Sequence, residues 1–172
     1  MLSIPILFIV GSLFHFLYDF SNQNPIIALI SPVNESIWEH NKMVVLPPIL
    51  FWILFYSIKG KSFSINKNRW FTAAFIAIIT MLITIPLLYY FYTQAFGVEL
   101  LWVDILILLV AIILGQLMGL HFYKHSKGIT WYIPLLLLCS IIFLFAIFTY
   151  YPPHIPLFMD PQTGVYGIQE HT

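Results

Sequence analysis

The chain has 172 residues, of which 60% are hydrophobic and only 8% are charged, and its mean hydropathy is +0.92. A water-soluble domain of this length cannot hide so much apolar surface, which excludes a soluble globular protein and predicts a multi-pass protein of the cell membrane with the lipid bilayer as a partner. Its seven Lys and Arg residues only balance seven acids, so we expect no nucleic-acid partner.

Five apolar runs predict five transmembrane helices, because about 20 helical residues cross the roughly 30 Å hydrocarbon core of a bilayer. The runs cover residues 2–20, 43–58, 70–92, 99–121 and 129–150. The connections are short and no internal repeat is visible, so we expect residues 1–172 to form a single transmembrane domain. The predicted fold class is therefore an all-α integral membrane protein, a five-transmembrane-helix bundle.

The first run ends in two ionisable residues, His15 and Asp19, which are four apart and share one helical face. The run lacks a basic leading segment and a small-residue cleavage site, so we expect it to be retained rather than removed as a signal peptide. The single cysteine, Cys139, lies in the fifth run, and we expect neither a disulfide nor a thiolate metal cluster.

The stretch SPVNESIWEH (31–40) concentrates polar residues between the first two runs. Its first two residues have the composition of a helix start, with serine at the cap and proline at the first helical position. We therefore expect a short outer helix to begin at that proline and to lead into span two. On such a helix Glu35, Glu39 and Lys42 would lie on one side.

The cations are distributed unevenly along the chain. Only Lys42 lies outside two loops, and the six others are Lys59, Lys61, Lys67, Arg69, Lys124 and Lys127. The positive-inside rule places these loops and the N-terminus in the cytoplasm, and the C-terminal tail, 151–172, outside. The acids gather at the outer ends of the spans or in outer segments, and they are Asp19, Glu35, Glu39, Glu99, Asp104, Asp160 and Glu170. We expect the proline-rich tail to fold back over this outer end as a lid.

Carboxylates and imidazoles are expected to converge on one outer-facing cavity. Asp104 lies about a turn and a half inside span four, where an ionisable group is costly and is a functional candidate by default. The candidate catalytic residues are Glu35, Glu39, His40 and Asp104. The candidate ligands of a divalent metal are His15, Asp19, Glu39, His40 and His154. A purely structural alternative stays open, in which Asp104 bonds to Tyr or Trp groups, His15 pairs with Asp19, and Glu39 pairs with Lys42.

A second pair of histidines, His121 and His125, lies 17 helical residues from Asp104, or roughly 25 Å. This places the pair at the cytoplasmic end, where it reads as part of a basic patch at the lipid headgroups. An intramembrane zinc-hydrolase superfamily that includes alkaline ceramidases also uses a serine, an aspartate and such a histidine pair. The similar fragments here lie on opposite sides of the membrane, so that activity is not transferred; they are Ser12, His15, Asp19, His121 and His125. Gly115 and Gly119 are expected to permit close helix packing.

With SPVNESIWEH, YPPHIPLF and DPQTGVYGI, the chain resembles a family of small bacterial integral membrane proteins known only as a domain of unknown function. The resemblance implies a multi-spanning membrane protein and brings no activity with it. Three hypotheses remain open at this point. The first is a metal-assisted hydrolase or transferase that acts on a lipid or lipid-linked substrate, the second a small cation- or proton-coupled transporter or channel, and the third a non-catalytic accessory protein that docks a membrane-protein partner.

Overall fold

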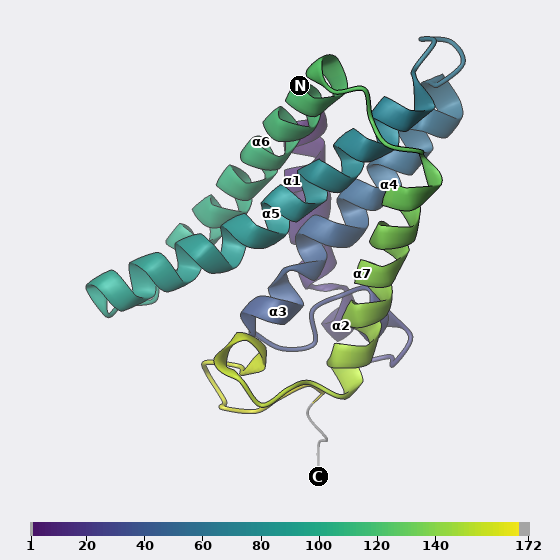
Figure 1. Cartoon of the computed structure of the whole chain (residues 1–172). Coiled ribbons are helices and arrows are strands. Elements are labelled where there is room, and N and C mark those ends of the chain that lie inside the picture. The colour runs from purple at the N-terminus through teal and green to yellow at the C-terminus, as the bar shows by residue number, and fades with distance from the viewer. Residues whose placement is uncertain (1, 169–172) are drawn as a thin grey trace.

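The computed structural model of the chain describes residues 2–168 and is built of helices, as predicted (Figure 1). Its α-helices are α1 (Ser3–His15), α2 (Leu17–Phe20), α3 (Ile37–His40), α4 (Lys42–Lys59), α5 (Lys67–Phe96), α6 (Leu101–His125) and α7 (Tyr132–Tyr150). Two short 3₁₀ turns, η1 (Ile27–Leu29) and η2 (Pro156–Phe158), lie in the connecting segments.

Four helical segments are long and apolar enough to cross a membrane: Ile37–Lys59, which joins α3 to α4, and the helices α5, α6 and α7. Helix α1 is also apolar, but its 13 residues span only about 20 Å, less than the roughly 30 Å of a bilayer core. This finding corrects the prediction of five full-length spans to four, with a shorter N-terminal apolar helix. The apolar helices indicate a lipid bilayer as the environment of the protein.

A side chain from the following loop ends the first helix. In an unbroken α-helix the N–H of Tyr18 would donate to the carbonyl of Phe14. The hydroxyl of Ser31 instead lies between these two groups, accepting from Tyr18 N at 3.0 Å and donating to Phe14 O at 2.6 Å. An inserted polar group interrupts the helical hydrogen-bond ladder. The regular helix therefore stops at His15, and the chain continues through the short turn of α2.

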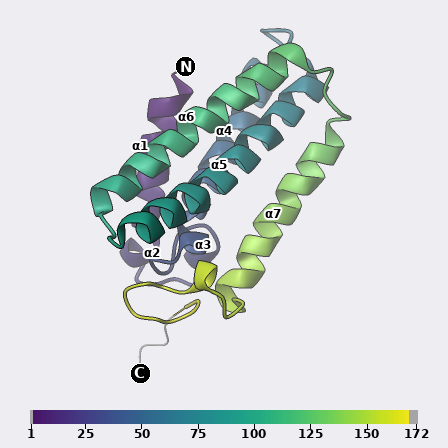
Figure 2. The ribbon, with the colours of Figure 1, turned by 60° about the vertical axis from the view of Figure 1, so that its left-hand side comes forward.

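The connecting segments separate into two ends of the bundle. The N-terminus, the α4–α5 loop and the α6–α7 loop lie at one end, and α2, α3, the α5–α6 turn and the described part of the tail lie at the other (Figures 1 and 2). Six of the seven cations lie in these two loops or in the helix ends beside them, at the same end of the bundle as the N-terminus. The acids of the described residues belong to the elements of the opposite end, and Glu170 lies outside the described residues.

Small residues let α5 and α6 pack closely, as predicted for Gly115 and Gly119. A Cβ atom at Gly115 would lie 2.7 Å from the carbonyl oxygen of Ala77, and one at Gly119 would lie 3.0 Å from the Ala77 Cβ atom. Ala73 and Ala77 on α5 are fully buried against this surface. Both helices also contribute residues near the α5–α6 turn to the cavity described below.

The tail folds back, as predicted, on the end of the bundle that carries α2 and α3. The centre of the Phe158 ring lies 4.6 Å from that of Trp38, which lies in α3 at the start of the long segment Ile37–Lys59. The side-chain amide of Asn34 donates to the carbonyl of Gly167 at 2.8 Å. The described part of the tail therefore covers α3 and the loop before it.

Candidate functional site

A cavity of about 680 Å³ opens at the α3 end of the bundle, between α1, α4, α5 and α6. Its polar lining comes from α1, α3, α5, α6, the loops before α3 and α6, and the tail, and it consists of Ser12, His15, Glu35, His40, Tyr89, Glu99, Asp104 and Gln162. The remaining lining residues are apolar. A pocket of this size with a few convergent polar groups is the usual form of a small-molecule site.

Three side chains bring their ligand atoms together on the wall of this cavity. The Nε2 atoms of His15 and His40 lie 3.2 Å apart, and Glu35 Oε2 lies 3.3 Å from His40 Nε2 and 3.7 Å from His15 Nε2. The three candidate ligand atoms all lie within 4.8 Å of one another, and the group could hold a metal ion. Two imidazoles and one carboxylate form the ligand set of many catalytic zinc sites, which keep a further position open for water or substrate.

The loop backbone sets the orientation of the His40 ring. The Nδ1 atom of His40 lies 3.0 Å from the carbonyl oxygen of Ser36. Because a carbonyl oxygen only accepts hydrogen bonds, this contact requires the proton on Nδ1. The Nε2 atom, which faces Glu35 and His15, then either carries a second proton and donates to the Glu35 carboxylate or offers its lone pair to a metal ion. A backbone carbonyl that fixes the tautomer in this way is a common support for a metal-binding histidine.

The charge of Glu35 is stabilised by its two neighbours. Hydrogen bonds from His15 and His40 hold the pKa of the Glu35 carboxyl well below its usual range, and this effect outweighs the opposing effect of partial burial. The carboxylate is therefore ionised at neutral pH. An ionised oxygen beside two imidazole nitrogens is a suitable ligand for a divalent cation.

A buried serine caps the short helix that carries His40. The backbone N–H of Glu39 donates to the Ser36 hydroxyl at 3.3 Å, and α3 begins at Ile37. The expected helix start at Pro32 is therefore wrong, because the preceding residues form a loop in which Ser36 N donates to Asn34 Oδ1 at 2.9 Å. As a result Glu35 lies in the loop and not on one helical face with Glu39.

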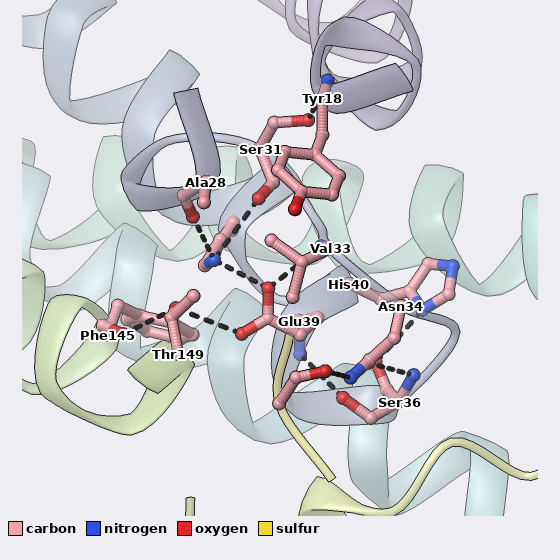
Figure 3. A network of polar contacts seen from close by, with 12 residues as sticks. Tyr18, Ala28, Ser31, Val33, Asn34, Ser36, Glu39, His40, Phe145 and Thr149 are labelled. Carbon is pink, nitrogen blue, oxygen red and sulfur yellow. Dashed lines mark hydrogen bonds and ion pairs between the residues drawn. The ribbon is translucent and has the colours of Figure 1, made fainter. Parts of the chain in front are cut away.

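Glu39 points away from the cavity into a buried polar network (Figure 3). Its Oε2 atom accepts from Lys42 Nζ and from the N–H of Val33, and its Oε1 atom accepts from the Thr149 hydroxyl on α7 at 3.1 Å. Lys42 also donates to two carbonyls, those of Ala28 at 2.7 Å and Ser31 at 3.1 Å. Both charged side chains are buried, so this pair joins the loop, α4 and α7 behind the candidate metal group.

Two tyrosines of α5 bond to the carboxylates at the start of α6. The hydroxyl of Tyr92 donates to Asp104 Oδ1 at 2.7 Å, and that of Tyr89 donates to Glu99 Oε1 at 2.9 Å. The structural alternative for Asp104, a bond to a tyrosine, is thus present. Asp104 also lines the cavity, together with Glu35 and His40.

The structure brings four of the sequence-predicted candidates to one cavity: His15, Glu35, His40 and Asp104. Asp19 is exposed on α2 and does not belong to the cavity lining. His154 is exposed in the tail, and its ring lies 4.6 Å from that of Tyr166.

Sequence reasoning overlooked Glu35 as a metal ligand and Ser31 as a support for the end of α1. The motif Ser36-x-x-Glu39 was the available signal for the helix start, and it would have separated Glu35 from Glu39. The pair His121 and His125 has ring centres 4.6 Å apart at the opposite end of α6 from Asp104. Among residues 2–168, the group that could hold a metal is made of His15, Glu35 and His40.

Comparison with known proteins gives a family and no activity. Residues 1–168 match the sequence model of a family of unknown function, DUF6512. No curated protein and no solved structure matches the chain. Because the match covers nearly the whole chain, the protein belongs to DUF6512, a family of unknown function.

Proposed function

We propose that the protein is a membrane-embedded enzyme, a metal-assisted hydrolase or transferase that acts on a lipid or lipid-linked substrate. His15, Glu35 and His40 bind one divalent cation, with zinc as the best match to two imidazoles and a carboxylate. The observation that carries the proposal is the convergence of these three ligand atoms, within 4.8 Å of one another, on the wall of a large cavity.

The positions of the ligands in the fold support binding of a metal rather than a chance contact. His15 comes from the end of α1, Glu35 from the loop before α3, and His40 from the end of α3. Ser31 ends α1 at His15, and Ser36 both caps α3 through its hydroxyl and accepts a hydrogen bond from the His40 ring through its carbonyl oxygen. The loop between the first two long apolar runs thus positions all three ligands through polar contacts of its own.

Asp104 is the general base of the proposed reaction. It lines the same cavity as His40 and Glu35, and Tyr92 orients it through a hydrogen bond of 2.7 Å. A metal bound there would polarise a water molecule, and in a hydrolysis Asp104 would accept the proton of that water as it forms the new bond to the substrate and would return the proton to the leaving oxygen as the old bond breaks. In a transferase, a hydroxyl of the acceptor takes the place of water.

The proposed site faces the outside of the cell. Six of the seven cations lie in the loops or helix ends at the opposite end of the bundle, and cations near the ends of spans favour the cytoplasm. The cavity, by contrast, is lined by three carboxylates. The N-terminus is then cytoplasmic, and the described tail covers the outer end beside the cavity.

The proposal is tested by the metal content of the protein purified in detergent. Elemental analysis and titration with Zn²⁺ are expected to give about one ion per chain, since three donor atoms converge at one place. His40→Ala and Glu35→Gln each remove one ligand and are expected to weaken Zn²⁺ binding by roughly 100-fold or more, because each lost ligand bond costs several kcal/mol.

His121→Ala is the matched control, because it removes a histidine from the pair at the other end of α6. This variant is expected to bind Zn²⁺ as the wild type does. A wild-type protein that binds no divalent ion, or equal binding by His40→Ala and His121→Ala, would overturn the proposed function.

A further inference from the structure

On three helical segments the lining of the cavity changes from polar to apolar with depth, whereas on α1 the polar Ser12 lies one turn deeper than His15. At its outer end stand His40, Tyr89 and Asp104, and one turn deeper stand Met43, Ile85 and Leu108. The chain runs inward along α4 and α6 and outward along α5 (Figures 1 and 2). In each pair the apolar residue lies three or four positions deeper along the helix than the polar residue. The three apolar residues therefore lie at a common depth, about 4.5–6 Å below the polar ones.

The rim of the cavity between α1 and α6 is apolar and exposed. Phe16, just after α1, is 49% exposed, and Ile105 on α6 is 48% exposed, although both line the cavity. Leu108, one turn deeper than Asp104, is only 7% exposed. Apolar side chains at a rim are unfavourable against water and favourable against acyl chains. The opening between α1 and α6 therefore suits entry from the bilayer.

The charges of the cavity set a condition on the headgroup. Glu35, Glu99 and Asp104 bring three carboxyl groups to the cavity, whose combined charge in the ionised form exceeds the two positive charges of a divalent cation held by neutral imidazoles. A headgroup with a net negative charge would add repulsion in a partly dry space. A zwitterionic headgroup avoids this repulsion, because a phosphate oxygen of the headgroup can approach the metal while the ammonium group of the same headgroup lies near Glu99 or Asp104.

We infer that the cavity takes a zwitterionic phospholipid, which enters between α1 and α6 with an acyl chain against Ile85 and Leu108 and its headgroup at His15, Glu35 and His40. This inference rests on the proposed function, for which it names the substrate class. The volume of about 680 Å³ leaves room for part of one chain together with the headgroup. Lipid selection then depends on two features: the apolar floor admits the chain, and the acidic wall selects the headgroup.

Native mass spectrometry of the whole chain in detergent tests this inference, with phosphatidylethanolamine as the zwitterionic probe and phosphatidylglycerol of the same chains as the anionic one. Leu108→Trp fills the floor of the cavity and is expected to weaken phosphatidylethanolamine binding by roughly tenfold or more. Leu106→Trp is the matched control, because Leu106 is exposed on the same helix and does not line the cavity. It is expected to bind as the wild type does.

Ile85→Phe fills the cavity from the facing helix and is expected to act as Leu108→Trp does, so a folding failure of one variant leaves the other as a test. The wild type is expected to prefer phosphatidylethanolamine to phosphatidylglycerol by roughly tenfold, for the charge reason given above. Equal binding by the floor variants and Leu106→Trp, or no preference between the lipids, would overturn the inference.

Zn²⁺ titration of the same variants separates this inference from the proposed function. The floor variants leave the three metal ligands in place and are expected to keep wild-type Zn²⁺ binding. Loss of lipid binding with Zn²⁺ retained supports the lipid inference. Zn²⁺ binding without any lipid effect removes the inference and leaves the metal site standing, whereas a failure to bind Zn²⁺ removes the proposed function itself.

Discussion

Replacing Lys42 with methionine is expected to destabilise the folded protein by about 3–5 kcal/mol, the usual cost of removing one partner from a buried ion pair. Methionine has nearly the length of lysine, so the change removes the charge and leaves little empty space. It strands the Glu39 carboxylate, which is 2% exposed, and it takes the donor away from two loop carbonyls. Unfolding of the detergent-solubilised protein by heat or denaturant measures the loss.

Two further variants show whether the stranded charge is the cause. Glu39→Gln combined with Lys42→Met removes both charges, keeps one side-chain oxygen to accept from the N–H of Val33, and presents an NH2 group that can donate to the hydroxyl oxygen of Thr149. The double variant is expected to be more stable than Lys42→Met alone, which is the mark of coupled groups. Lys59→Met, an exposed position on the same helix, should change stability by no more than about 0.5 kcal/mol. Equal stabilities of Lys42→Met and Lys59→Met would contradict the structural role of the pair.

Replacing Asp104 with asparagine is expected to lower the rate of lipid turnover by roughly 100- to 10,000-fold, the usual contribution of a general base. Asparagine has the shape of aspartate and still offers an oxygen to the Tyr92 hydroxyl, so the fold and the bound metal are expected to remain. The measurement is the release of free fatty acid or of the soluble headgroup from phosphatidylethanolamine in mixed micelles, together with the Zn²⁺ content of each variant.

The role of Asp104 has its own controls. Tyr92→Phe removes the hydrogen bond that orients the carboxylate and is expected to slow turnover only by roughly tenfold, since one such bond contributes about 1 kcal/mol. Asp19→Asn changes an exposed aspartate outside the cavity lining and is expected to leave the rate unchanged. Full activity in Asp104→Asn, with Zn²⁺ bound, would exclude Asp104 as the base.

The sequence predicts the parts of this fold that depend on composition and period. Apolar runs of sufficient length locate α4 to α7, and the uneven distribution of cations predicts which loops share an end. Asp104 stands out because a carboxylate inside an apolar run is costly. His15 and His40 were identified as candidates because they lie at the ends of apolar runs beside carboxylates. Each of these signals is local, and each could be read without knowing the tertiary structure.

The parts that were mispredicted depend on contacts between distant segments. The end of α1 is decided by Ser31, which lies 17 residues after Phe14 and inserts its hydroxyl into the helix. No sequence feature near His15 predicts this break in the helix. The start of α3 had two competing signals, a proline after Ser31 and a serine three residues before Glu39. The second one prevailed, and it sends Glu39 to Lys42 and Thr149 while Glu35 stays in the cavity.

In the proposed site, His15, Glu35 and His40 bind one metal ion together. X-ray absorption at the zinc edge of the Zn²⁺-loaded protein tests this claim most directly, because it reports the atoms bound to the ion. We expect a zinc coordination shell of nitrogen and oxygen at about 2.0–2.2 Å, with the signature of two imidazoles and no sulfur. In His40→Ala we expect the signature of one imidazole to be lost. A shell that contains sulfur, or one that is unchanged in both His15→Ala and His40→Ala, would contradict the proposed site.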